Sequence, residues 1–126
     1  MSFDEGRYLE IYEDVSGTQV FGTGTGDTTL VTVKANHTIY VQRYSVQATT
    51  GSSGKTWSFE DSASTPISIS GSLDMATSPA NYEKFYGAEG VALTEAKNLV
   101  LNVSAAGAAG IVTWQAYQKL TVVAAA

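Results

Sequence analysis

Residues 98–104 read Asn-Leu-Val-Leu-Asn-Val-Ser, and residues 56–60 read Thr-Trp-Ser-Phe-Glu. In both stretches an apolar side chain returns at every second position. This period of two is typical of a β-strand with one buried face, because successive side chains of a strand point to opposite sides. Similar short segments, separated by Gly, Ser and Ala, follow one another from His37 to Tyr117, and one of them, Pro66–Ser70, is expected to be a short strand. The pattern predicts an all-β protein.

The spacing of these segments indicates the architecture. We count about eight to ten strands at intervals of roughly 8–12 residues and no convincing helix, a pattern typical of sandwiches and barrels. We expect an antiparallel β-sandwich, and among such folds a jelly roll of about eight strands. A lipocalin-like barrel is less favoured, because the strands and loops are uneven in length. The length of 126 residues suits one domain. We assign it to residues 7–123, after a flexible N-terminal arm at residues 1–6.

Three local features refine this expectation. The apolar positions of the strand at residues 38–48 change phase after Val41, which predicts a β-bulge near Gln42 and Arg43 or a strand that crosses between sheets. The segment Ser78–Phe85 could hold one helical turn that opens at Pro79. The linker Ala105–Gly110 is expected to join the last two strands as a hairpin.

The composition excludes several classes of function. The formal net charge is −5, and the seven Lys and Arg residues are scattered. This argues against nucleic-acid binding and against an anionic membrane surface, both of which need clustered positive charge. There is no Cys, so disulfides and thiolate chemistry are excluded. The first residues show no secretory signal and no apolar run is long enough to span a membrane, so we expect synthesis in the cytoplasm.

No group of residues indicates a catalytic, cofactor or metal site, and we do not expect an enzyme. The Gly-rich stretch Gly22–Asp27 is interpreted as a flexible turn, since a phosphate loop needs a following helix and a Lys-Ser/Thr pair. His37 is the only His and is interpreted as a turn or surface residue. Two acidic groups could bind Ca²⁺ only if their oxygens converged, and a solvated surface is the favoured interpretation. Their members are Glu10 with Asp14, and Glu60 with Asp61 and Asp74.

The tyrosines are the more informative side chains. Tyr8, Tyr12, Tyr40 and Tyr44 fall at strand positions opposite to aliphatic residues, so they are predicted to line the outer face. An outward Tyr can belong to a subunit interface, to a carbohydrate platform, or to a strand that simply favours aromatic residues. As explanations of the outward tyrosines, a subunit interface and the strand preference, taken together, are favoured over sugar binding. Trp57 and Trp114 share the phase of apolar neighbours and are predicted to be core residues.

The chain resembles the small β-sandwich virion proteins of tailed bacteriophages, namely capsid decoration (cement) proteins and related minor structural proteins. The resemblance covers roughly residues 37–120. It rests on a closing pattern of Leu99-x-Leu101-x-Val103 followed by Gly110-x-Val112-x-Trp114, a pattern that often forms the last hairpin in such proteins. The resemblance also includes four earlier segments, which are Tyr40-Val41-Gln42, Trp57–Asp61, Thr65-Pro66-Ile67 and Gly90–Leu93.

The resemblance implies a structural function without cofactors or catalytic residues. It implies a homo-oligomer, a dimer or trimer, that binds the major capsid protein on the outer surface of the virion after synthesis in the host cytoplasm. Tyr8, Tyr12, Tyr40 and Tyr44 are then the interface candidates. The alternative is a carbohydrate- or receptor-binding module of a tail or spike, with exposed aromatic rings beside a loop such as Thr49–Gly54.

Overall fold

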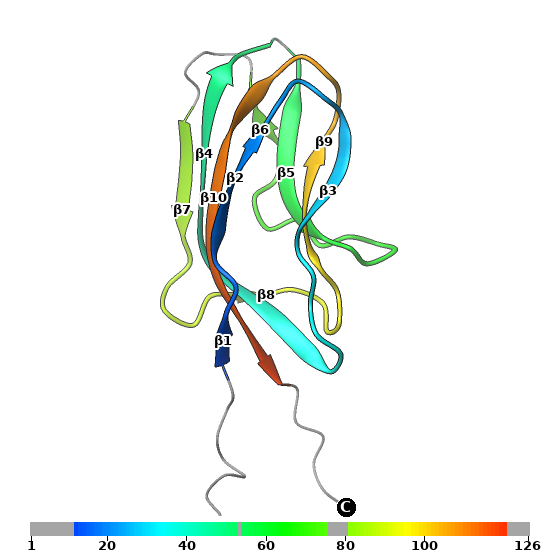
Figure 1. Cartoon of the computed structure of the whole chain (residues 1–126), viewed down its shortest axis with the longest axis vertical. Helices are drawn as coiled ribbons and strands as arrows, with labels where there is room; N and C mark the ends of the chain where they lie inside the picture. The colour runs from blue at the N-terminus through cyan, green and yellow to red at the C-terminus, as the bar shows by residue number, and fades with distance from the viewer. Residues whose placement is uncertain (1–11, 53, 76–80, 121–126) are drawn as a thin grey trace, which may run out of the picture.

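The computed structural model describes residues 12–52, 54–75 and 81–120, which form two antiparallel β-sheets packed face to face (Figure 1). The predicted all-β sandwich is therefore confirmed. The residues expected to form the arm, 1–6, and the interface candidate Tyr8 lie outside the described residues. The strands are β1 (Tyr12–Asp14), β2 (Gly17–Phe21), β3 (Gly26–Val31), β4 (His37–Thr50), β5 (Thr56–Asp61), β6 (Leu73–Asp74), β7 (Asn81–Phe85), β8 (Val91–Ala92), β9 (Leu99–Val103) and β10 (Ala109–Leu120).

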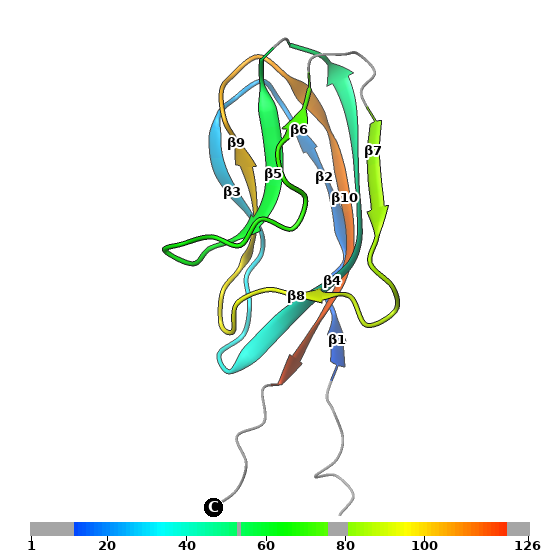
Figure 2. The same cartoon turned by 180° about the vertical axis from the view of Figure 1, so that it is seen from behind.

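The order of the strands shows that the chain alternates between the two sheets. The first sheet has the order β1-β10-β4-β7, with β2 also paired to β10 and β8 to β4. The second sheet has the order β3-β9-β5-β6. The view from behind shows the two layers, with β3, β9 and β5 in one and β4, β10 and β7 in the other (Figure 2). Consequently most connections cross from one sheet to the other.

This alternation corrects the expected final hairpin. The linker Ala105–Gly110 was predicted to join two paired strands, but β9 pairs with β3 and β5, whereas β10 pairs with β1, β2 and β4. The prediction was wrong because alternation identifies the buried face of a strand and not the sheet to which the strand belongs. The linker instead crosses the end of the sandwich.

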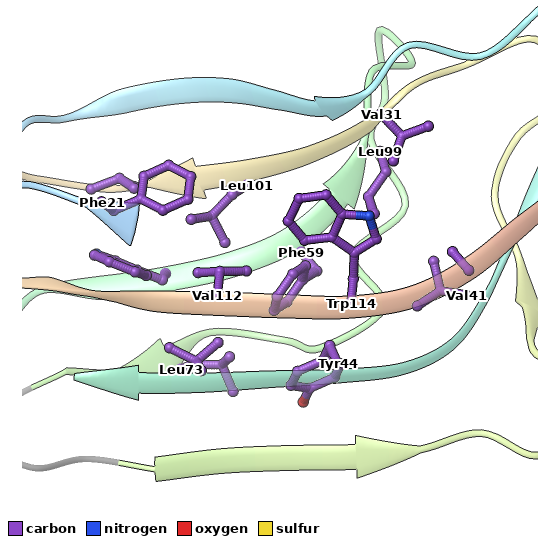
Figure 3. Packing of buried hydrophobic residues seen from close by; sticks show 14 of the residues in the cluster. Phe21, Val31, Val41, Tyr44, Phe59, Leu73, Leu99, Leu101, Val112 and Trp114 are labelled. Atoms are coloured by element: carbon purple, nitrogen blue, oxygen red, sulfur yellow. The ribbon is translucent and has the colours of Figure 1, made fainter. Parts of the chain in front are cut away.

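The core lies between the sheets, where their inward side chains interdigitate (Figure 3). Trp57, Phe59, Leu99 and Leu101 are fully buried, and Trp114 is 6% exposed, as their alternation predicts. Trp114 donates a hydrogen bond from Nε1 to the Val15 carbonyl oxygen at 2.8 Å. In the part of the chain that the structure describes, the buried Nε1 of Trp57 has no hydrogen-bond partner.

A β-bulge in β4 lies where the sequence predicts it. Gln115 of β10 pairs with Arg43, and the next residue, Ala116, pairs with Val41, so Gln42 is the extra residue. Such a bulge reverses the side of the sheet to which the following side chains point. Tyr44 is therefore turned inward and only 5% exposed, with its ring centroid 4.6 Å from that of Phe59. The prediction that Tyr44 lines the outer face was wrong.

Two further local expectations need correction. The segment expected to hold a helical turn contains β7, in which Arg43 to Gln47 of β4 pair with Phe85 to Asn81. Pairing along the long strand β4 outweighs the weak local preference for a helical turn, and Pro79 lies outside the described residues. The predicted strand Pro66–Ser70 is reduced to one bridge between Glu60 and Ser68.

Candidate interaction surface

One end of the first sheet presents three tyrosines and a lysine on its outer face. Tyr12 comes from β1, Tyr40 from β4, and Tyr117 and Lys119 from β10, the strand between them. The register places Tyr117 directly opposite Tyr40 and Lys119 directly opposite Tyr12. We call these four residues the tyrosine surface. It exists only because three strands far apart in the sequence are neighbours in the sheet.

The three rings of the tyrosine surface pack against one another. The Tyr40 and Tyr117 rings are stacked, with centroids 5.1 Å apart and planes inclined by 9°. The Tyr12 ring meets Tyr117 edge to face at 5.2 Å. The Lys119 ammonium lies 5.9 Å from the Tyr12 centroid and 5.8 Å from the Tyr40 centroid. These distances suit offset stacking, T-shaped and cation–π contacts, which hold the side chains in fixed positions.

The loop between β7 and β8 forms a wall beside the rings. The Tyr117 hydroxyl donates a hydrogen bond to the Glu89 carbonyl oxygen at 2.7 Å, and Gln42 Nε2 donates one to the Ala88 carbonyl oxygen at 2.6 Å. Gly90 has a φ of 77°, and a Cβ there would lie 2.8 Å from the Val41 carbonyl oxygen. Both the backbone angle and the close approach require glycine. The bulge residue Gln42 thus anchors the loop.

Two adjoining hollows flank Tyr117. One is lined by Tyr12, Tyr40, Tyr117 and Lys119 with Glu89 and Gly90. The other shares Tyr12, Tyr117 and Glu89, and adds Asp14, Gln42 and Ala88. Together the two hollows form a groove on the outer face that is lined by the three tyrosines and by polar and charged residues. Tyr12 is 55% exposed at its mouth.

Charges of both signs surround the groove. Lys119 stands among the rings, while Asp14 lines one hollow. Glu13 of β1 forms a salt bridge with Lys34 at 2.7 Å. Hydrogen bonds from Lys34 and Gln118 hold the pKa of Glu13 below its ordinary value. An exposed pair of this kind contributes little to stability. Because Glu13 alternates with Tyr12 and Asp14 and lies opposite the buried Gln118, this pair is on the other side of the sheet from the tyrosines. The tyrosine surface itself combines aromatic rings with the charged side chains of Lys119 and Asp14, a mixture typical of protein interfaces.

The outer face of the second sheet has a different character. Asp27, Asn102 and Ser58 lie opposite one another across β3, β9 and β5, as outward polar side chains in the phase opposite to the buried one. Asn102 Nδ2 donates a hydrogen bond to Asp27 Oδ1 at 2.6 Å. Within the described residues, β3, β5 and β9 carry no outward aromatic side chain. The aromatic groups are thus concentrated on one face of the sandwich.

The structure brings together some predicted interface candidates and adds others. Tyr12 and Tyr40 share one surface, whereas Tyr44 is in the core. Tyr117 and Lys119 belong to the surface and were missed by sequence analysis. Their signal was present, because Trp114 and Ala116 occupy the buried phase of β10, and Tyr117 and Lys119 lie in the opposite phase.

The other side chains considered for chemistry have structural roles. His37 Nδ1 lies 2.8 Å from the Ala35 carbonyl oxygen, beside the turn residue Asn36 with a φ of 62°. Glu60 lies four residues along β5 from Thr56, the partner of Asp74, so the two acids are separated by ~13 Å of strand. Glu10 is outside the described residues. Among those that are described, no three His, Cys, Asp or Glu side chains converge on a metal site.

Asp61 is 1% exposed and ties the end of β5 to two loops. Its Oδ1 accepts hydrogen bonds from the backbone N–H groups of Ala63 at 3.2 Å and Ile67 at 3.0 Å. Its Oδ2 accepts from the Thr94 backbone N–H at 3.0 Å and the Thr94 hydroxyl at 2.6 Å. Burial opposes ionisation of this carboxyl, but these hydrogen bonds outweigh it and lower its pKa. Asp61 is a structural residue.

Fold and surface together define the class: an all-β, two-sheet sandwich with an aromatic groove on one outer face. Comparisons with family models, with curated proteins and with solved structures find no match for the chain. In the part of the chain that the structure describes, no helix is long and apolar enough to cross a membrane.

Proposed function

We propose that the protein is a structural virion protein that binds and stabilises a bacteriophage capsid as a homo-oligomer. The tyrosine surface carries this proposal. It would contact the major capsid protein on the outer surface of the virion. Tyrosines packed against one another, beside polar side chains and a groove, are the kind of residues that dominate binding energy at protein interfaces.

We also propose that the sandwich is a jelly roll. The strands β2, β10, β4 and β7 face the strands β3, β9, β5 and β6, and the chain crosses between the sheets at most connections. Eight strands in two sheets are the framework of a jelly roll, an architecture of viral capsid and lectin domains. The architecture therefore suits the proposed function and also the second candidate below.

Binding through a small surface becomes effective on a lattice. The tyrosine surface has four residues, far fewer than the roughly 20–30 residues that each partner contributes to a standard interface of ~1,600 Å². Several copies joined in an oligomer can bind neighbouring capsid subunits at once, and each further contact then forms at a high effective concentration. Bridging neighbouring subunits in this way would stabilise the capsid lattice.

A carbohydrate- or receptor-binding tail or spike module is the second candidate, because aromatic rings beside Lys119 and Glu89 could contact a sugar. Two observations weigh against it. The Tyr117 ring stacks on that of Tyr40 and also contacts that of Tyr12, so less of it is left for a sugar. The loop Thr49–Gly54 lies at the other end of β4, about 30 Å of strand from Tyr40. A glycan array with specific hits that compete with capsids would reverse the ranking.

The proposal is tested with purified protein and expanded empty capsids. Light scattering is expected to give a dimer or trimer, and co-sedimentation is expected to show saturable binding to the capsids. Bound protein should also raise the temperature at which the capsids disassemble. A monomer that does not co-sediment with capsids would contradict the proposal.

A further inference from the structure

The free edges of the two sheets differ in how they are protected. An edge strand exposes unpaired N–H and C=O groups, and proteins protect such edges with charges, bulges or short strands. β1 carries Glu13 and Asp14, and β7 carries Glu83 and Lys84. β3 carries Asp27 and has a register irregularity between Thr29 and Val31. β6 and β8 are two residues long.

β2 has none of these protections. Its sequence, Gly-Thr-Gln-Val-Phe from Gly17 to Phe21, contains no charged residue and no proline. One side of β2 pairs with β10, and no strand of the described residues pairs with the other side. Figure 1 shows β2 beside β10, with β7 at the opposite edge of the sheet. The edge of β2 is therefore open to another strand.

An exposed apolar residue lies in the middle of this open edge. Val20 is 74% exposed, more than any other large apolar side chain among the described residues. It pairs with the half-buried Ile111 of β10, so the two form an apolar row that ends at the edge. Burying this valine in an interface would remove its apolar surface from water, which favours association.

We propose that β2 pairs antiparallel with β2 of a second copy, about a two-fold axis at Val20. The pairing joins the two first sheets into one continuous sheet. Val20 then lies opposite its own counterpart, Gln19 opposite Phe21, and Thr18 opposite Gly22, so no like charges meet. The apolar row becomes Ile111, Val20 and their counterparts. This symmetric pairing deepens the proposed function, because it supplies the homo-oligomer on which that function rests.

The open edge of β2 and the tyrosine surface lie on different parts of the first sheet. The tyrosine surface lies where β1 and the end of β10 pair, whereas β2 pairs with residues 110–114 of β10. Pairing through β2 therefore leaves the tyrosines uncovered and holds two tyrosine surfaces in one assembly. A pairing of five residues per strand is short, so we expect a reversible dimer that the capsid lattice reinforces.

Single cysteine variants test the pairing, because the chain has no Cys of its own. In an antiparallel pair, opposing Cα atoms are about 4.5–5.5 Å apart, within the range that a disulfide spans. Val20→Cys should therefore form an intermolecular disulfide under mild oxidation. Asn81→Cys, on the exposed outer face of the opposite edge strand β7, is the matched control. We expect cross-linking of Val20→Cys to be at least about tenfold faster than that of Asn81→Cys.

A second variant, Val20→Lys, places like charges opposite one another and should shift the oligomer to monomer in light scattering. Equal cross-linking rates of the two cysteine variants, or an unchanged oligomer in Val20→Lys, would overturn the pairing. Capsid binding is measured separately on the unaltered protein. If it binds capsids although the pairing is overturned, the proposed function stands and the oligomer uses another surface.

Discussion

At the scale of single residues, the two tryptophans offer a direct comparison. Both are buried, but only Trp114 makes a hydrogen bond with its Nε1, to the Val15 carbonyl oxygen. Each substitution by Phe leaves a small cavity, and Trp114→Phe also loses that hydrogen bond. We expect Trp114→Phe to reduce the free energy of unfolding by about 1 kcal/mol more than Trp57→Phe. Urea denaturation measures the free energy of unfolding of both variants. An equal loss for the two would contradict a stabilising hydrogen bond from Trp114 Nε1.

Asp61 gives the protein a pH-dependent contribution to stability. Both carboxylate oxygens accept hydrogen bonds, two each, from N–H and O–H groups. In Asp61→Asn one of these oxygens becomes an amide N–H₂, which is itself a donor and would face another donor. We expect a loss of about 2–4 kcal/mol at pH 7. The folded-state pKa is lowered, so this stabilisation is present above the unfolded pKa, about 3.9. It is lost as the pH falls further, through the folded pKa.

The difference in unfolding free energy between Asp61 and Asp61→Asn should therefore shrink below a pH of about 4. Thermal melts of both proteins across the acidic range measure it. The variant Glu95→Gln, on an exposed carboxylate of the β8–β9 loop, is the control and should change little at any pH. A difference that stays constant from neutral to acidic pH would rule out an ionised Asp61.

At the scale of elements, the bulge in β4 determines which residues form the core. Deleting Gln42 removes the extra residue and leaves a regular alternation, in which Val41 and Tyr44 both still face inward opposite Ala116 and Trp114 of β10. We therefore expect the deletion variant to keep cooperative thermal unfolding, although it also loses the hydrogen bond from the Tyr86 N–H to the Gln42 carbonyl oxygen. Gln42→Ala keeps the chain length and loses only the hydrogen bond to the Ala88 carbonyl oxygen, at about 1 kcal/mol. A deletion variant that no longer unfolded cooperatively would contradict Gln42 as the extra residue of the bulge.

The elements also show what can be read from sequence. Alternation identified the strands of the core, and a change of phase located the bulge, because both are local properties of the chain. Tyr44 was misplaced because its outward position ignored that same change of phase. The pairing of β10 with β4 rather than β9, and the conversion of Asn81–Phe85 into a strand, depend on partners distant in sequence. Local pattern cannot identify such partners.

For the candidate site too, the sequence shows which side chains point outward but not which of them are neighbours. Tyr12 and Tyr40 could be proposed as outward residues from their own strands. That they meet Tyr117 and Lys119 follows from the order β1-β10-β4, which no short stretch of sequence contains. The phase of β10 gave Tyr117 an outward direction, but only the register gave it neighbours.

At the scale of the whole molecule, the two outer faces of the sandwich differ. The first sheet carries the tyrosine surface near one end and the open edge of β2. Among the described residues, the outward side chains of β3, β5 and β9 include no aromatic ring. This asymmetry favours a protein that uses the first sheet for contacts and leaves the second toward solvent.

Capsid binding by tyrosine variants tests the central claim most directly. The double variant Tyr12→Ala/Tyr40→Ala is compared with Ile67→Ala, which removes an exposed apolar side chain from the loop between β5 and β6. Both are titrated onto expanded empty capsids after light scattering has confirmed equal oligomeric states. We predict that the dissociation constant rises at least about tenfold for the double variant and less than about twofold for Ile67→Ala. Equal binding by the double variant and the unaltered protein would contradict the account.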